Sequence, residues 1–282
     1  MAKIIYDIFD ESLLNSGTYN YSLSLFISNH ACTYLILDNE KWLAYRSYSL
    51  EAHSRTLFSI RDELEMLMNS DKMLKFSFRE VKICYLTSAF TMIPEELYSD
   101  ENLYAYFNSV CPSPASEIIR SEKCGSDIRN LYLVKIELLQ FLEASFPGAK
   151  MEHFFSGMIS SVRKNTDLQD TTLFVNFHLN QMQVLVCNER QILLANNYDF
   201  QTPGDVAYFI MLAFDQLGLD PESNAIYLSG HINEKAELYN AICRYVRKVH
   251  FRETGLPAFP EGSAFAAYPL HTFVDISQHL LS

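Results

Sequence analysis

The chain has 282 residues, about twice the length of an average domain, and this length predicts two domains. Apolar residues make up 49% of the sequence and charged residues 20%. That composition supplies a sizeable core and excludes an intrinsically disordered chain or a disulfide-stapled miniprotein. The formal net charge of -12 argues against nucleic acid or an anionic membrane as the main partner, because both would repel the protein.

The sequence predicts a cytoplasmic protein with no membrane span. Its longest apolar run, residues 206–214, is closed by Asp205 and Asp215 and is far shorter than the roughly 18 residues of a spanning helix. The first residues lack the apolar stretch of a secretory signal, since Asp7 comes almost at once. No CxxC pair occurs, so we expect reduced, mostly buried thiols. The six cysteines are Cys32, Cys84, Cys111, Cys124, Cys187 and Cys243.

Three antiparallel strands are predicted over residues 22–50, where apolar and polar positions alternate between turn residues. An amphipathic helix follows and ends near Met68, because apolar side chains recur at steps of three and four. These side chains are Leu57, Ile60, Leu64 and Leu67. A buried strand is predicted next, over 81–86.

The second half has the same order of elements. Alternating apolar residues predict strands over 173–179, 183–187 and 192–198. A helix then begins at a capping Thr202, with proline at its first position, and ends at Gly218. A buried strand over 225–230 and a helix with Leu238, Ile242 and Val246 on one side complete this half.

Superposing the two halves aligns the turn at 39–41 with the turn at 188–190, and the first helix, starting near Ser54, with Pro203. Each half is therefore interpreted as three strands, a helix, a strand and a helix. Between them we predict a strand over 131–136, a helix over 137–146 and a strand over 149–153. We expect residues 1–128 to form the first domain and 129–282 the second.

The end of the chain is predicted to be irregular before a last ordered segment. Two prolines and two glycines lie within 255–262 and indicate a loop. The apolar residues 270–274 and a short helix follow. We expect this tail to pack back on the first domain.

This order of elements resembles the subdomain plan of the actin, sugar kinase and heat-shock protein ATPase superfamily, and 131–153 resembles the insertion of type IV pilus assembly relatives. The segments 194–200, 204–208, 227–230 and 269–273 are similar to an uncharacterised Bacteroidetes family with an actin-like ATPase fold. The resemblance implies an α/β, ribonuclease H-like architecture. It would have two duplicated subdomains with mixed five-stranded sheets flanked by helices, and it implies no assigned reaction.

The hairpin turns that would hold nucleotide phosphates lack the residues that this chemistry needs. Neither 26–32 nor 176–182 contains glycine, which lets backbone amides approach a phosphate, or aspartate, which organises Mg²⁺. The chain also lacks GxxxxGK[ST], HExxH, GxSxG and GxGxxG motifs. We therefore assign no catalytic residue and no cofactor. We also assign no metal site, since the eight histidines are dispersed in the sequence and only the fold could assemble a metal-binding cluster from them.

Six residues remain as candidates for contacts in a cleft between the domains. They are Ser28, Asn29, His178, Asn180, Gly230 and His231. Gly230 is also explained by a turn after a strand, and His178 by a structural hydrogen bond. Arg252 belongs to a modest basic cluster near the end of the last predicted long helix, a common place for cations.

The leading hypothesis is a non-catalytic binding or scaffold module with degenerate phosphate loops. One alternative is an atypical nucleotide-binding protein or ATPase that uses the polar side chains of those turns. Another, by analogy with the pilus assembly relatives, is an assembly partner that captures a peptide between the domains. A protein or peptide partner is thus expected, and nucleic acid is not.

Overall fold

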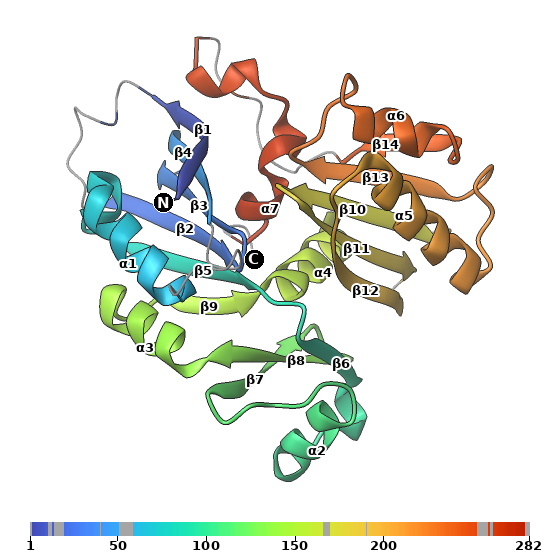
Figure 1. Ribbon diagram of the computed structural model, residues 1–282, viewed down its shortest axis with the longest axis horizontal. Helices are drawn as coiled ribbons and strands as arrows, with labels where there is room; N and C mark the ends of the chain where they lie inside the picture. The colour runs from blue at the N-terminus through green and yellow to red at the C-terminus, as the bar shows by residue number, and fades with distance from the viewer. Residues whose placement is uncertain are drawn as a thin grey trace.

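Two large β-sheets face each other, and a small third sheet lies at the bottom of the view in Figure 1. The protein is seen in a computed structural model that describes residues 2–10, 13, 20–39, 41–50, 59–165, 170–189, 191–252, 259 and 262–279. Helices cover the outer faces of both large sheets. The predicted α/β class is therefore confirmed.

The first sheet has six strands in the order β1-β4-β3-β2-β5-β9. Along the chain these are β1 (Lys3–Phe9), β2 (Tyr21–Ser28), β3 (Ala31–Asp38), β4 (Lys41–Ser49), β5 (Glu80–Leu86) and β9 (Lys150–His153). β2 pairs antiparallel with β3 and parallel with β5, so the sheet is mixed. The sequence predicts five of these strands, and β1 adds an edge strand to them.

Two helices, α1 (Ile60–Ser70) and α3 (Ile136–Ser145), pack together on the outer face of the first sheet (Figure 1). Ser59 caps α1 in a capping box with Asp62, which satisfies amide groups at the start of the helix. The predicted helix start near Ser54 lies outside the described residues. Both helices are otherwise confirmed.

The second sheet has five strands in the order β12-β11-β10-β13-β14. They are β10 (Thr172–His178), β11 (Gln181–Asn188), β12 (Gln191–Asp199), β13 (Ala225–Gly230) and β14 (Lys248–Phe251). Its outer face carries α5 (Pro203–Leu217) and α6 (Glu237–Cys243). As predicted, Thr202 caps α5 and Gly218 ends it in a left-handed conformation with φ 64°. Val246, predicted on α6, lies beyond the end of that helix.

The small sheet has the order β6-β8-β7, with β6 (Phe90–Pro94), β7 (Glu117–Cys124) and β8 (Ile128–Lys135). All neighbouring strands in it are antiparallel. It packs with the short helix α2 (Leu103–Asn108). Two 3-10 turns, Glu95–Leu97 and Asp100–Asn102, lie between β6 and α2 in the chain. Of these strands, the sequence predicts only β8.

The two large sheets have the same strand order if the extra β1 is set aside. Both bounds of β3 and β11, and both bounds of β4 and β12, correspond at one constant offset. At that offset Asn39 corresponds to Glu189, and these turn residues have φ values of 53° and 48°. The sequence superposition, which aligned Asn39 with Asn188, was therefore wrong by one residue. Internal duplication remains our interpretation of the shared order.

The passage from the first sheet to the second comes later in the chain than residue 128. That residue is the first of β8, and β9 after it pairs in parallel with β5 of the first sheet. The helix α4 (Phe154–Asn165) follows β9 and lies between the two large sheets (Figure 1). We propose that the boundary between the halves lies in α4.

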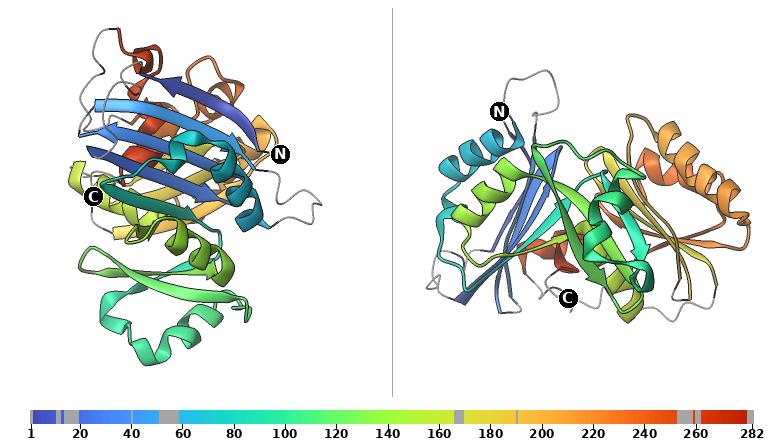
Figure 2. Two further views of the ribbon diagram at one scale, coloured as in Figure 1. Left: turned by 90° about the vertical axis from the view of Figure 1, so that its left-hand side faces the viewer. Right: turned by 90° about the horizontal axis from the view of Figure 1, so that it is seen from below.

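The C-terminal tail lies between the two large sheets and contacts both. It contains the 3-10 turns Ala264–Ala267 and Leu270–Phe273 and the helix α7 (Val274–Ser277). α7 contacts β2, β3 and β13, and Ser24 Oγ donates a hydrogen bond to the carbonyl of Ile276 at 3.0 Å. Figure 2 shows α7 between the sheets. The tail therefore contacts strands of both large sheets.

One apolar cluster joins the inner faces of both sheets, α4 and the tail. Its members include Phe26 and Leu35 from the first sheet, Phe174 and Leu185 from the second, Phe154 and Met158 from α4, and Phe273 and Ile276 from the tail. These side chains are buried. Side chains therefore fill the middle of the molecule.

The helices and the cysteines bear on the expectations about membranes and thiols. Within the described ranges, no helix is both long enough and apolar enough to cross a bilayer. All six cysteines are free thiols, and four of them are buried. Cys111 is partly exposed and Cys243 is exposed, so the expectation of buried thiols holds for Cys32, Cys84, Cys124 and Cys187.

Candidate functional site

Of the polar residues at the two hairpin turns singled out in the sequence, some are exposed and others are buried. Ser28 is buried at the end of β2, where its hydroxyl accepts a hydrogen bond from the His30 amide at 3.2 Å. Asn29 at the first turn and Asn180 at the second are exposed. His178, the last residue of β10, is fully buried. These candidates therefore do not share one open surface.

Gly230 is required by the backbone where β13 ends. Its φ is +81°, and a Cβ at this position would lie 2.1 Å from the carbonyl oxygen of Phe177 on β10. The same oxygen accepts a hydrogen bond from the amide of His231 at 2.7 Å. Close approach of β13 to β10 therefore accounts for this glycine.

The fold brings two of the predicted residues, His178 and His231, together with Asp275 from α7. His178 Nδ1 lies 2.6 Å from Asp275 Oδ2, and His178 Nε2 lies 3.0 Å from Thr33 Oγ1 on β3. The imidazole centroids of His178 and His231 are 4.7 Å apart. His231 Nε2 lies 2.8 Å from the hydroxyl of Tyr45 on β4. Side chains from both sheets and from the tail thus meet in one buried cluster.

Burial sets the protonation of His231 and Tyr45 in this cluster. Removal from water disfavours the charged imidazolium and, with a smaller effect from His178, lowers the pKa of His231 to about 3. Burial and the charge of Asp275 raise the pKa of Tyr45 well above its ordinary value. Both groups are therefore neutral near pH 7, and His231 offers a nitrogen lone pair to its surroundings.

A second buried polar network lies where β7, β9 and α4 meet. One carboxylate oxygen of Glu122 accepts hydrogen bonds from the His153 amide, at 2.8 Å, and from the Ser156 hydroxyl. Cys124 Sγ donates to Ser156 Oγ at 3.1 Å. Burial is the main cause that raises the pKa of Glu122 to about 7. No spacing in the sequence predicts this network, because its members come from separate elements.

Next to this network, a cysteine, a histidine and a carboxylate stand in the order used by thiol enzymes. Cys84 Sγ lies 2.9 Å from His279 Nε2, and His279 Nδ1 bonds to Glu152. Cys84 and His279 are fully buried, and burial raises the pKa of the Cys84 thiol well above its ordinary value. A protonated, enclosed thiol is a poor nucleophile, so this arrangement anchors the tail.

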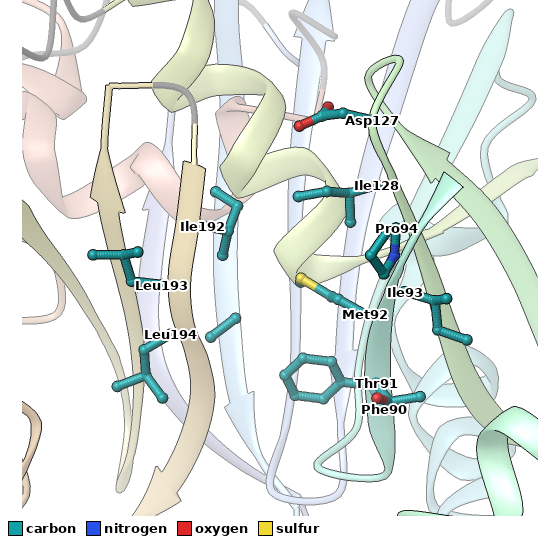
Figure 3. Close-up of a pocket in the computed structure, with 11 residues that line it drawn as sticks. Phe90, Thr91, Met92, Ile93, Pro94, Asp127, Ile128, Ile192, Leu193 and Leu194 are labelled. Atoms are coloured by element: carbon teal, nitrogen blue, oxygen red, sulfur yellow. The ribbon is translucent and has the colours of Figure 1, made fainter. Parts of the chain in front are cut away.

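A pocket of about 340 Å³ opens between β6 and β12 (Figure 3). Each of these strands is the outermost of its sheet. The walls facing the gap include Phe90, Met92 and Ile128 on one side and Ile192 on the other, as Figure 3 shows. Asp127 lies at the end of the pocket, where Arg163 donates two hydrogen bonds to its carboxylate. Apolar side chains therefore lie on both walls of the pocket, and a paired charge lies at one end.

Sequence reasoning missed the pocket, since its two walls are distant in the chain. The only local sign is the apolar composition of 90–94 and 192–195. The basic cluster singled out in the sequence is not one surface, because Arg252 is buried and donates a hydrogen bond to Ser161 Oγ at 2.8 Å.

Comparisons with known proteins agree with this architecture. A family model described as "Protein of unknown function (DUF3822)" matches residues 10–249. A crystal structure from Bacteroides thetaiotaomicron VPI-5482, described as a protein with actin-like ATPase fold and unknown function, superposes with a TM-score of 0.76 at 17% identity. It covers 94% of this chain and 97% of that one. No curated protein matches the sequence.

A second solved structure with this fold is a PilM-PilN type IV pilus biogenesis complex. It superposes with a TM-score of 0.61 at 11% identity, over 92% of this chain and 97% of that one. The actin-like fold expected from the sequence is therefore confirmed, as is the resemblance to the uncharacterised family and to the pilus assembly proteins.

Proposed function

Since the chain belongs to the DUF3822 family and has the actin-like ATPase fold, we propose that it is a non-catalytic binding module. In this proposal it takes up an extended, apolar segment of a partner protein. The partner lies in the pocket between β6 and β12. The buried cluster between the two large sheets holds the molecule together.

The observation that carries this proposal is the position of α7. Its Asp275 is fully buried against His178, next to the hairpin where a phosphate would have to bind. A phosphate there would meet a fixed carboxylate and would be repelled by it. The amide of His30 at the other turn already donates to Ser28. These contacts favour a structural use of the strand ends over nucleotide binding.

The open strand edges favour an extended partner. β6 and β12 have no neighbouring strand on their outer side among the described residues. An unpaired edge offers backbone donors and acceptors to an added strand, and pockets beside it accept alternate side chains. The apolar walls select apolar side chains, and the net charge of -12 favours a partner segment with basic flanks. The solved PilM-PilN complex adds support for a protein partner.

We test this proposal by selecting peptides from a random library on the immobilised full-length protein and measuring affinities by fluorescence polarisation. Enriched peptides should alternate apolar residues. Met92→Glu should weaken them about tenfold or more, because the new carboxylate loses its hydration when the pocket fills. Ala195→Glu places the same charge on the opposite wall and should do likewise.

The matched control is Met66→Glu, the same substitution on α1, where the side chain is already 47% exposed. It should leave the affinity unchanged. Circular dichroism and urea unfolding verify that each variant is folded. Failure to enrich any peptide, or equal binding to all three variants and the wild type, would contradict the proposal.

A further inference from the structure

Three side chains capable of binding a metal meet where the two sheets and the tail join. His178 ends β10, His231 follows β13, and Asp275 lies on α7. One ligand atom from each lies within 4.8 Å of the others. His178 and Asp275 have no exposed surface. This cluster has no role in the proposed peptide binding, so it needs an explanation of its own.

The orientation of both imidazoles fits a metal site. In each ring Nε2 faces a hydroxyl, that of Thr33 at 3.0 Å for His178 and that of Tyr45 at 2.8 Å for His231. Thr33 Oγ1 also bonds to Ser47 Oγ at 2.7 Å, so it can accept from His178 while donating to Ser47. Histidines that bind metals are typically held in this way through the nitrogen opposite the metal.

Of the two remaining nitrogens, one has no partner and the other faces a carboxylate. His231 Nδ1 is buried and has no hydrogen-bond partner among the described residues. His178 Nδ1 lies 2.6 Å from the Asp275 carboxylate. In the tautomer that donates from Nε2 to Thr33, the Nδ1 lone pair faces this carboxylate, and a cation placed between them would bind both. A buried nitrogen without a hydrogen-bond partner destabilises the fold, and a metal ion bound to it would remove that cost.

We propose that His178 Nδ1, His231 Nδ1 and the Asp275 carboxylate bind a divalent transition metal, and that this ion fastens α7 between the two sheets. Two imidazoles and one carboxylate suit Zn²⁺, whereas Mg²⁺ and Ca²⁺ prefer oxygen ligands alone. Ligand atoms around tetrahedral Zn²⁺ are about 3.3 Å apart. His178 and Asp275 therefore move slightly apart when the ion binds between them, and His231 moves closer.

The test uses the full chain and Zn²⁺ itself. Because the ligands are buried, the protein is unfolded in urea with a chelator and refolded with or without ZnCl₂. Metal content is then measured by plasma mass spectrometry. We expect one tightly held Zn²⁺ per chain and a higher melting temperature for the loaded protein. Refolding with Co²⁺ should give the visible absorption of a nitrogen- and oxygen-liganded ion.

Two variants and a matched control assign the ligands. His231→Gln and Asp275→Asn should lose the metal and the melting-temperature shift. His250→Gln replaces an exposed histidine on β14 and should keep both. Absence of stoichiometric Zn²⁺ in refolded wild type would overturn the proposal. So would full retention of the metal by both ligand variants, or its equal loss in His250→Gln.

Discussion

Replacing Gly230 by alanine tests whether this glycine serves the backbone or a ligand. The added Cβ would lie 2.1 Å from the carbonyl oxygen of Phe177, a backbone atom that cannot rotate away. β13 would have to separate from β10 and weaken the 2.7 Å hydrogen bond from the His231 amide. A left-handed φ of +81° adds its own cost to alanine. We expect a loss of about 3–5 kcal/mol in the free energy of unfolding.

The matched control is Gly148→Ala. Gly148 has nearly the same φ, +79°, but its added Cβ would meet nothing within 4 Å. Gly148→Ala therefore measures only the cost of placing alanine at a positive φ, about 1 kcal/mol in the free energy of unfolding. Urea unfolding of both variants, followed by circular dichroism, measures the difference. If Gly230→Ala loses no more stability than Gly148→Ala, the close approach of β13 to β10 does not explain the glycine.

Three further substitutions have expected outcomes in urea unfolding. Burial raises the pKa of Glu122 to about 7 from an ordinary 4.5. The free energy of unfolding of the wild type should therefore fall by about 3 kcal/mol as the pH rises between these values, because the buried carboxyl ionises. The free energy of unfolding of Glu122→Gln should stay constant over that range. The same decrease as in the wild type would refute the assignment of the raised pKa to Glu122. Asp71→Asn should cost about 3 kcal/mol at pH 7, because the carboxylate accepts from Tyr34, Tyr48 and Arg46. Since the pKa of Asp71 is lowered in the fold, this deficit should shrink in acid, and a constant deficit would contradict it. Thr202→Ala should cost about 1 kcal/mol through loss of the α5 capping box, and no change would show that the cap is dispensable.

Elements with a strong local pattern could be predicted from the sequence. The alternation over 22–50 predicts β2, β3 and β4, and Thr202 with Gly218 predicts both ends of α5. β6 and β14 have only five and four residues, too few to show a period. The superposition of the two halves was wrong by one residue because it aligned the Asn-Glu dipeptide that occurs in both turns. The residues that correspond in structure are the left-handed turn positions Asn39 and Glu189.

The candidate site was only partly predictable for a different reason. His178, His231 and Gly230 could be proposed because they end strands of a recognisable plan. Asp275 could not, since its position against His178 depends on where the tail folds back. The pocket between β6 and β12 likewise depends on how two sheet edges from distant segments come together. Contacts of this kind leave no spacing in a single sequence.

The central claim is that the buried α7 and its Asp275 leave no nucleotide site between the two sheets. Calorimetric titration of ATP with Mg²⁺ into the wild-type protein tests it most directly. We predict no saturable heat from ATP or ADP. Saturable, Mg²⁺-dependent binding that is weakened by His178→Ala or Asn180→Ala would contradict the claim and favour an atypical nucleotide-binding protein.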